Sequence, residues 1–471
     1  MRVAHDVDTV VAAEQVLLDA LPDGALMQRA STGLATVCAD LLPRVYGSRV
    51  VLLVGSGNNG GDALHAGAWL AARGARVEAL LLADRAHEGG LAALRRAGGR
   101  VRPTGDSTAT AVPDGTDLIV DGILGIGGRG GLRGAAAELV AALPDDATVV
   151  AVDVPSGVDA STGQVEGVAV RADVTVTFGS LKPGLVVDPG AGLAGAVELV
   201  DIGLDLPPAD VELLQAEDVR HLLPRPSRES DKYRRGVVGV AAGSAQYTGA
   251  AVLCTGGAVR GGAGMVRYVG ADEPAGLVRG AWPEVVVGAG RVQAWTVGSG
   301  GGGDAGDRLA DALGDGVPVV VDADAIAAVP ELVRHDDAPL LLTPHAGELA
   351  RLVGADRDDV EARRLHHARA AARELDAVVL LKGSTTVVAR PDGRVRVNPT
   401  GTAALATAGS GDVLAGLAGA LLAGGLDPFD AGSVAAWVHG LAGRLAHDGG
   451  APVSATDVLA ALPAALGRLA R

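Results

Sequence analysis

Two of the glycine clusters that stand beside acidic residues could do chemistry, and one of them is ATAGSGDVLAG, residues 406–416. Gly409, Ser410 and Gly411 precede Asp412 and an apolar run that predicts a helix. Backbone N–H groups at the start of a helix bind anions, and glycines leave them accessible. Because a carboxylate repels phosphate, we expect Asp412 to take the proton from a hydroxyl group that attacks a phosphoryl group. Capping of the helix is its alternative role.

The other place is GSGNNGG, residues 55–61, which follows an apolar run. It contains the spacing G-x-G-x-x-G, and Asp84 follows as a ribose-binding acid would in a dinucleotide fold. This spacing alone is weak evidence in a chain with 70 glycines. Asn58, Asn59 and Asp62 add side-chain oxygens to the loop, so it could hold a cation as well as a phosphate.

Further oxygen-bearing side chains end two apolar runs of the first half. Asp121 ends LIVDGIL, and Asp153 and Ser156 end VAVDVPSG. The carboxyl ends of parallel strands line the ligand crevice of an open sheet, so these three residues should converge with the 58–62 loop. Ordinary turn and capping chemistry is the alternative for each of them.

The second half carries three more motifs after or between apolar runs: TPHAGE at 343–348, KGSTT at 382–386 and NPTG at 398–401. His345 takes a crevice position, and we expect it to contact substrate. Only three of the 40 basic residues are lysines, and Lys182, Lys232 and Lys382 all lie in or next to glycine-rich segments. A retained lysine suggests a site that needs a compact ammonium group, although chance could also leave three.

Apolar runs of strand length alternate with helical segments along both halves, which predicts parallel sheets covered on both faces. In the first half two helices are expected within 8–43, and the strands are expected at 49–55, 76–82, 118–124, 148–154 and 173–179. The pattern restarts after the polar stretch 224–236, with runs at 236–243, 265–270, 284–290, 295–300, 317–324, 339–345 and 378–384 and a hairpin at 385–398. A domain boundary is therefore expected within about 206–230.

Composition narrows the class of protein. A chain of 471 residues exceeds one usual core, which predicts two domains. The net charge of −16 disfavours binding to nucleic acid or to an anionic membrane. Cys38 and Cys254 cannot form a disulfide framework, and neither a signal peptide nor a membrane span is expected. We therefore expect a cytoplasmic protein.

Taken together, these motifs resemble a known pair of families. GSAQYTGAA, TPHAGE, KGSTT and ATAGSGD make the second half similar to the nicotinamide-nucleotide-hydrate dehydratases of the ribokinase-like fold. NNGGD, VDGILG, VDVPSG and FGSLKPG make the first half similar to the hydrate epimerases that are often fused to them. The resemblance implies a Rossmann-like α/β/α epimerase domain at 1–210 and a ribokinase-like α/β/α dehydratase domain at 216–471.

The resemblance implies repair of NADH and NADPH hydrated at the nicotinamide C5=C6 bond. The first domain would interconvert the R and S hydrates, and the second would phosphorylate the C6 hydroxyl of the S form from ADP, or from ATP, and release phosphate. The implied groups are Mg2+ with the nucleotide and K+ at Asn59, Asp121 and Ser156, in a protein that we expect to be a homo-oligomer.

The residues carried over from the families fall into three sets. Asp153 and Asp412 are the implied catalytic residues. The nucleotide would lie against Lys382, Gly383, Ser384, Thr385, Thr386, Gly409, Ser410 and Gly411. The hydrates would lie against Asn58, Asn59, Gly60, Gly61, Asp62, Gly125, Ile126, Gly127, Gly128, Arg129, Gly130, Gly131 and Asp153 in the first domain, and against Ala251 or its neighbour Ala250, Gly300, His345 and Asp412 in the second.

Departures from the family patterns are small. Ala63 replaces the last glycine of NNGGDG, and TPHAGE has alanine where many members have proline. Two other functions stay open: a vitamin-precursor kinase with a non-catalytic first domain, and an NAD-dependent oxidoreductase that uses the 55–60 loop. Neither the choice between ADP and ATP, nor the preference for NADH or NADPH hydrates, nor the role of Lys182 follows from the residues.

Overall fold

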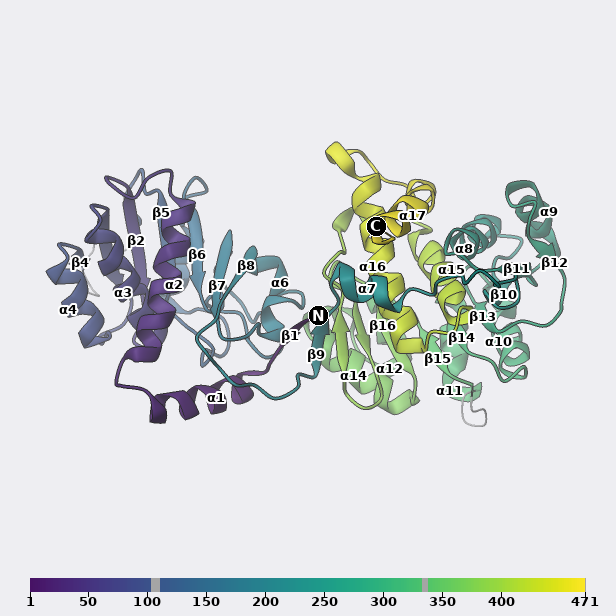
Figure 1. Cartoon of the computed structure of the whole chain (residues 1–471), viewed down its shortest axis with the longest axis horizontal. Coiled ribbons are helices and arrows are strands. Elements are labelled where there is room, and N and C mark those ends of the chain that lie inside the picture. The colour runs from purple at the N-terminus through teal and green to yellow at the C-terminus, as the bar shows by residue number, and fades with distance from the viewer. Residues whose placement is uncertain (103–110, 333–337, 471) are drawn as a thin grey trace. The chain divides into compact units, whose positions relative to one another are not determined.

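The computed structural model describes residues 1–102, 111–332 and 338–470. The chain forms two compact units, one of residues 3–209 and one of residues 210–471 together with the first two residues. Figure 1 shows a sheet flanked by helices in each unit. No helix in these described ranges is long and apolar enough to cross a membrane.

The unit of residues 3–209 is built on a parallel sheet whose strands run in the order β4-β3-β2-β5-β6-β7-β8. The strands are β2 (Arg49–Val54), β3 (Arg76–Leu81), β4 (Arg100–Arg102), β5 (Leu118–Gly122), β6 (Thr148–Val152), β7 (Val174–Phe178) and β8 (Ala196–Val200). The predicted runs are confirmed as strands β2, β3, β5, β6 and β7. Val and Leu lie on both faces of these strands, which therefore require a helical layer on each side of the sheet.

Helices cover both faces of this sheet. The helices are α1 (Val7–Ala20), α2 (Ala25–Leu41), α3 (Asn58–Ala71), α4 (Glu88–Arg96), α5 (Gly134–Ala141) and α6 (Ala191–Ala194), with a 3-10 turn, η1, at Pro183–Leu185. Leu34 of α2, Leu64 of α3 and Leu94 of α4 share one core with the sheet, whereas Leu139 of α5 packs into the core on the other face. The three-layer α/β/α architecture is thereby confirmed.

The larger unit contains a sheet in the order β1-β9-β18-β17-β16-β15-β14-β13-β10-β11-β12. Its strands are β1 (Arg2–Ala4), β9 (Val211–Leu213), β10 (Val237–Ala241), β11 (Met265–Tyr268), β12 (Val286–Val287), β13 (Ala294–Val297), β14 (Val319–Val321), β15 (Leu340–Leu342), β16 (Val378–Leu381), β17 (Val387–Ala389) and β18 (Val395–Val397). Strands β10 to β16 pair in parallel, and β17 pairs antiparallel with β16 and β18, as the predicted hairpin requires.

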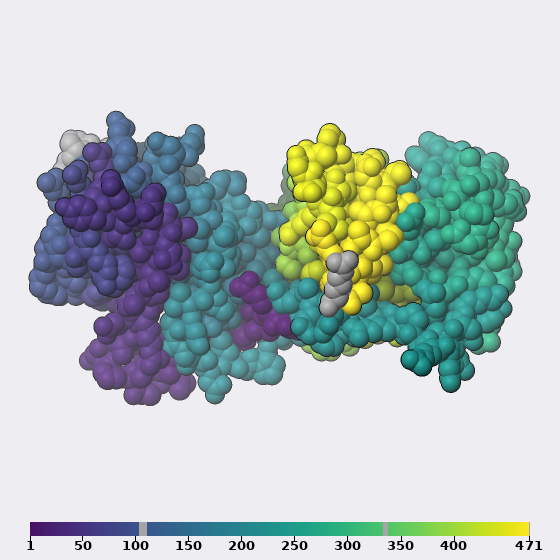
Figure 2. Space-filling model, turned by 45° about the horizontal axis from the view of Figure 1, so that its top comes forward, coloured from purple at the N-terminus to yellow at the C-terminus, as the bar shows by residue number. Residues whose placement is uncertain are grey.

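The helices of this unit also lie on two faces. They are α7 (Ala216–Leu222), α8 (Thr248–Arg260), α9 (Asp272–Ala281), α10 (Ala305–Leu313), α11 (Val329–Leu332), α12 (Ala346–Val353), α13 (Arg357–Ala362), α14 (Arg364–Leu375), α15 (Ser410–Ala423), α16 (Pro428–Ala446) and α17 (Ala455–Leu469), with 3-10 turns at Gly302–Asp304, Ala323–Ala328, Ala403–Leu405 and Asp448–Gly450. Helices α15 and α16 are almost wholly buried, while α17 reaches the surface in yellow in Figure 2. Burial of α15 fixes the glycine loop that begins it.

Candidate active sites

The amide of Asn59 ties the glycine loop of the first unit to two strand ends. Asn59 lies in the first turn of α3, and its Nδ2 donates to Leu124 O at 3.0 Å and to Val152 O at 2.6 Å. Gly60 lets α3 approach β2, because a Cβ there would lie 2.4 Å from Gly55 O. The helix start and the carboxyl ends of β5 and β6 therefore meet at one edge of the sheet, as the sequence predicts.

Asp121 and Ser156 lie together at this edge. Asp121 is 0% exposed, and its carboxylate accepts hydrogen bonds from Ser156 Oγ at 2.6 Å, Ser156 N at 2.8 Å and Ile123 N at 3.2 Å. Burial raises the pKa of Asp121 to about 6, against the lowering effect of the hydrogen bonds from Ser156 and Ile123. No basic side chain in the described ranges forms an ion pair with it. The described residues therefore supply no counter-ion for this buried negative charge.

Asp153 has a charged partner within the protein. Lys182, which is 0% exposed, donates from Nζ to Asp153 Oδ1 at 2.5 Å, to Phe178 O at 2.9 Å and to Thr177 Oγ1 at 3.0 Å. Asp153 has a φ of 66°, a conformation that costs a non-glycine residue about 1–3 kcal/mol. The structure thus holds the Asp153 carboxylate in a fixed position against a buried ammonium group.

Two further carboxyl groups share the surroundings of Asp153. Asp62 is buried on α3, and its Oδ1 has no hydrogen-bond partner in the described part of the chain. Burial, followed by the charges of Asp153 and Glu14, raises the pKa of Asp62 well above its ordinary value. Burial and Asp153 also raise the pKa of Glu14, which lies on α1 and was not among the predicted site residues. The carboxyl groups of Asp62, Glu14 and Asp153 therefore lie close enough together to interact electrostatically.

The predicted loop of residues 125–131 runs beside this edge. Gly128 N donates to Gly125 O at 2.8 Å, and Gly131 N donates to Glu166 O at 3.0 Å. Gly127 and Arg129 are exposed, Ile126 is half-buried, and Gly130 has a φ of 73°. The remaining predicted residues of this half, Asn58 and Gly61, lie in the first turn of α3.

In the larger unit, the GSGD motif forms the start of α15. Gly409 has a φ of 87°, which favours glycine, and Ser410 Oγ donates to Leu405 O at 2.7 Å. The first-turn N–H groups of Gly411 and Asp412 have no partner within the helix, which makes this terminus suited to an anion. Asp412 is half-buried, and burial, followed by the charge of Asp322, raises its pKa to about 7.

Lys382 lies next to this helix start. A Cβ placed on Gly411 would lie 3.3 Å from Lys382 Nζ. The ammonium group donates to Asp322 Oδ1 at 2.9 Å and lies 3.7 Å from Glu348 Oε2. Burial alone would lower the pKa of Lys382, but Asp322 and Glu348 outweigh that effect and raise it. Asp322 and Glu348 were not predicted, although Asp322 ends the run VPVVVDAD in the same way that Asp121 and Asp153 end theirs.

His345 and Glu348 form a capping box at the start of α12. His345 N donates to Glu348 Oε2 at 2.7 Å, and Glu348 N donates to His345 Nδ1 at 3.1 Å. The ring is exposed and available to a ligand, and partial burial lowers its pKa. Because Nδ1 accepts a hydrogen bond, the neutral ring carries its proton on Nε2.

The KGSTT loop is held by neighbouring backbone. Thr386 Oγ1 donates to Gly383 O at 3.0 Å, and a Cβ on Gly401 would lie only 1.9 Å from Ser384 O. Asn398 fixes the NPTG turn, because its Nδ2 donates to Ala436 O at 3.0 Å. The loop of Ser384 and Thr385 thus lies directly against NPTG.

Of the residues predicted to line the hydrate site of this unit, Ala250 and Ala251 lie at the start of α8, and Gly300 follows β13. Ala251 is 0% exposed and packs under Gly243, whereas its half-buried neighbour Ala250 adjoins Gly300. Gly300 has a φ of 57°, and a Cβ there would lie 2.7 Å from that of Ala250. Ala250 and Gly300 therefore border the same space.

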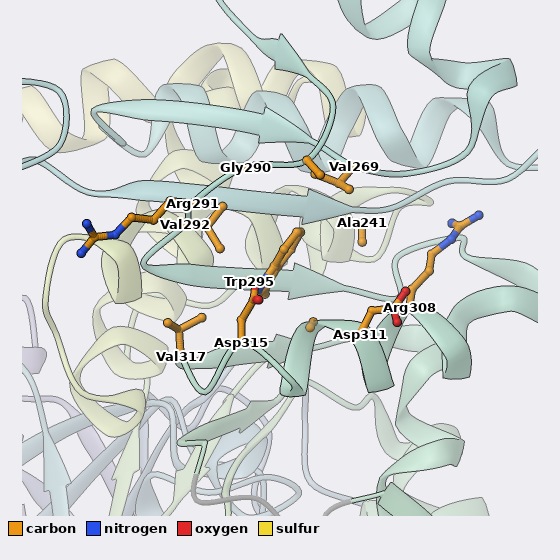
Figure 3. A pocket seen from close by; sticks show the side chains of 12 residues that line it. Ala241, Val269, Gly290, Arg291, Val292, Trp295, Arg308, Asp311, Asp315 and Val317 are labelled. Atoms are coloured by element: carbon orange, nitrogen blue, oxygen red, sulfur yellow. The ribbon is translucent and has the colours of Figure 1, made fainter.

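A cavity of about 560 Å3 lies elsewhere in the larger unit, on the face of the sheet that α10 covers. Figure 3 shows Trp295 in the middle of its wall, with Arg291 towards one end and Arg308 towards the other. Trp295 Nε1 donates to Asp315 at 2.9 Å. None of the predicted site residues lines this cavity.

Comparison with known proteins matches both halves of the chain. Residues 23–184 match the family described as YjeF-related protein N-terminus, and residues 238–464 match the family described as NAD(P)H-hydrate dehydratase. The bifunctional NAD(P)H-hydrate repair enzyme Nnr of Mycobacterium tuberculosis is 50% identical over 447 residues, which cover 92% of this chain and 91% of the relative. This chain belongs to the family of bifunctional NAD(P)H-hydrate repair enzymes.

Other members and a solved structure agree with this assignment. The repair enzyme of Mycobacterium leprae is 48% identical over 455 residues, which cover 93% of each chain. The ADP/ATP-dependent NAD(P)H-hydrate dehydratase of Bacillus subtilis, co-crystallised with ATP and Mg2+, has 30% sequence identity and a TM-score of 0.52, with 55% of this chain and 99% of that chain covered. Membership of the repair-enzyme family confirms the resemblance seen in the motifs. It supports the repair function over both alternative functions.

Proposed function

We propose that this repair enzyme epimerises the R and S hydrates of NADH and NADPH and dehydrates the S form at the expense of ADP, which yields AMP and phosphate. The observation that carries the proposal is the position of Asp412. Its half-buried carboxylate, with a pKa of about 7, stands at a helix start beside open N–H groups and Lys382. A base beside an anion site suits transfer of a phosphoryl group to a hydroxyl.

In the dehydratase unit, Asp412 takes the proton of the C6 hydroxyl as the hydroxyl oxygen attacks the terminal phosphoryl group of ADP, and AMP leaves with the electron pair of the broken phosphoanhydride bond. The N–H groups of Gly409 and Gly411 and the Lys382 ammonium stabilise the charge on the transferred group, whereas Ser410 N, also predicted to contribute, donates to Thr407 O at 3.3 Å. The C6–O bond then breaks, and phosphate leaves with the electron pair. Loss of a proton from C5 completes the double bond. Phosphate is a far better leaving group than hydroxide, which explains the consumption of a nucleotide.

The remaining residues of this unit bind and orient the two substrates. The loop of Gly383, Ser384, Thr385 and Thr386 holds the nucleotide, and Lys382 binds it at the terminal phosphoryl group. Ala250 or Ala251, Gly300, His345 and Asp412 contact the hydrate. The exposed ring of His345 faces the hydrate; its proton is on Nε2, because Glu348 N occupies Nδ1, and Nε2 lies 3.4 Å from Glu348 Oε1.

The acidic groups of this site fit Mg2+ bound together with the nucleotide. Asp322, Glu348 and Asp412 surround one lysine, so negative charge exceeds positive charge where phosphates must bind. Among the described residues no cluster of three or more acidic, histidine or cysteine side chains could hold a metal by itself. Glu348 would hold the ion together with the phosphates and water, as is usual for Mg2+. The bound ion would neutralise charge on the phosphates.

In the epimerase unit, Asp153 exchanges protons with the hydrate at C6. As a base it accepts the hydroxyl proton while the C6–N1 bond opens and N1 gains a proton, and the reverse steps reclose the ring on the other face. Lys182 keeps Asp153 in place through its hydrogen bond. The hydrate lies against residues 58–62 and 125–131, where Asp62 offers a buried oxygen that has no hydrogen-bond partner in the described part of the chain.

The edge formed by Asn59, Asp121 and Ser156 fits K+. Asp121 is a fully buried carboxylate with no counter-ion among the residues that the structure describes, and the Asn59 and Ser156 side chains add neutral oxygens. Oxygen ligands with a single carboxylate suit a hard monovalent cation. The ion would neutralise Asp121 and would keep the loop of Asn59 in place.

We further propose that the protein acts in the cytoplasm as a homo-oligomer on small molecules. A net charge of −16 disfavours nucleic acid as a partner.

The absorbance of restored NADPH at 340 nm tests the proposal. Purified protein receives a mixture of R and S NADPH hydrates with ADP, with ATP or without nucleotide. We expect recovery with ADP and none without nucleotide. Absence of recovery with both nucleotides would contradict the dehydratase function.

A further inference from the structure

We infer that Asp322 is a positioning residue that holds the Lys382 ammonium group against Gly411, so that Lys382 acts on the phosphoryl group being transferred and not on the rest of the nucleotide. This inference rests on the proposed dehydratase function and assigns separate roles to two residues within its site.

Four neighbouring parallel strands supply the residues of this arrangement. Asp322, Thr343 and Lys382 directly follow β14, β15 and β16, and Ser299 follows β13 by two residues. These strands are consecutive in the sheet, with Val297 paired to Val321 and Val321 paired to Leu342. The rigid edge of a parallel sheet therefore places all four side chains.

Hydrogen bonds fully determine the orientation of the Asp322 carboxylate. Asp322 is 1% exposed. Its Oδ2 accepts from Ser299 Oγ at 2.8 Å, and its Oδ1 accepts from Thr343 Oγ1 at 2.8 Å and from Lys382 Nζ at 2.9 Å. A carboxylate held in this way can fix an ammonium group that would otherwise have several rotamers on its flexible stem.

The position of that ammonium group determines what it can contact. The Lys382 side chain reaches Gly411, where a Cβ would lie 3.3 Å from Nζ. Gly411 also contributes a first-turn N–H group of α15 next to Asp412. A phosphoryl group on this helix start would meet Lys382 and the N–H groups on one side and would face the attacking hydroxyl held by Asp412.

The composition of the chain agrees with this role. Lys382 is one of three lysines among 40 basic residues, so the position keeps a compact ammonium where arginine is the common choice. A planar guanidinium presents its donors in a wider fork and is not equivalent to an ammonium group at such a site. If the ion pair of Asp322 and Lys382 had only a structural role, it would make the same contacts but its loss would have no specific effect on kcat.

Steady-state kinetics with the S hydrate of NADPH and ADP separate the two roles. We compare wild type with Lys382→Met, Asp322→Asn, the double variant and the control Lys232→Met, which removes an exposed lysine. We expect Lys382→Met to lower kcat roughly 100-fold while the KM for ADP changes about threefold at most. Asp322→Asn should lower kcat at least about tenfold and should cause no further loss in the Lys382→Met background.

Multiplicative losses in the double variant, or losses confined to the KM for ADP, would overturn the inference. If Asp322→Asn does not fold, Thr343→Val provides the second test, because it removes one hydrogen bond to the same carboxylate oxygen. It should lower kcat in the wild-type background and leave kcat unchanged in the Lys382→Met background; equal losses in both backgrounds would contradict the positioning role. An inactive wild type and an inactive Lys232→Met variant, with ADP and with ATP, would instead refute the dehydratase function.

Discussion

Lys182 Nζ and Asp153 Oδ1 lie 2.5 Å apart in a buried ion pair at the carboxyl edge of the first sheet. Lys182 is fully buried, and Asp153 keeps a left-handed backbone conformation beside it. The proposed acid–base group of the epimerase is thus held by a residue whose role did not follow from the sequence. This pair connects the stability of the unit with its chemistry.

Replacing Lys182 by Met should affect both properties. Loss of one partner leaves a buried charge unpaired, which typically costs about 3–5 kcal/mol. We expect the free energy of unfolding in urea to fall by roughly this amount and the rate of R-to-S conversion to fall at least about tenfold. The double variant Lys182→Met, Asp153→Asn should recover stability without recovering epimerase activity. Unchanged stability in Lys182→Met would contradict the ion pair.

The dehydratase should lose activity in acid, because Asp412 must be ionised to act as a base. Its pKa is raised to about 7, so kcat/KM should rise with pH through about 7 and then level off. A pH profile that falls over this range would contradict the assignment of Asp412 as base.

The same shift predicts how Asp412 affects stability. A carboxyl group whose pKa is raised in the folded state contributes stability at low pH that is lost as the pH rises through about 7. Asp412→Asn should therefore become more stable than wild type in urea as the pH rises from 5 to 8. The control Asp311→Asn, which changes an exposed aspartate of the same unit, should follow wild type.

Potassium should stabilise the protein through Asp121. The pKa of this buried carboxyl is raised to about 6 by burial, so its ionised form at pH 7.5 is costly without a counter-ion. We expect K+ to raise the Tm by several degrees at pH 7.5 and much less at pH 5. The variant Asp121→Asn should lose this dependence on K+. An equal effect of K+ on both proteins would place the cation elsewhere.

Gly401→Ala should disturb the nucleotide loop from outside the proposed contacts. A Cβ there would lie 1.9 Å from Ser384 O, so the loop must move. We expect the KM for ADP to rise at least about tenfold while the rate of epimerisation is unchanged. Gly393→Ala serves as the control, because a Cβ at this turn glycine meets no neighbouring atom, although its φ of 94° is strained for alanine. An unchanged KM for ADP in Gly401→Ala would separate the NPTG turn from the nucleotide site.

The sequence was sufficient to predict the strands that carry the sites, because buried parallel strands are continuous runs of Val and Leu. It missed β8, an edge strand that is largely exposed, and β1, β4 and β9, which have three residues each. Short or exposed strands bury too little apolar surface to leave such a run.

The site residues also differ in how clearly the sequence indicates them. Asp121, Asp153 and Ser156 were predictable because each follows an apolar run, and Asp322 shows the same signal without having been chosen. Glu14 lies on a helix with a partly exposed face, and only folding brings its side chain towards Asp153. Lys182 could be named as a glycine-flanked lysine, but its burial depends on the turn that follows β7.

The central claim is that Asp153 serves the epimerase and Asp412 serves the dehydratase, and replacing each aspartate in turn tests it most directly. Recovery of 340 nm absorbance from a mixture of R and S NADPH hydrates with ADP is compared for wild type, Asp153→Ala and Asp412→Ala. We expect wild type to recover the whole mixture, Asp153→Ala to stop at the S portion beyond slow spontaneous epimerisation, and Asp412→Ala to recover nothing. Full and equally fast recovery in Asp153→Ala, or any enzymatic recovery in Asp412→Ala, would contradict the account.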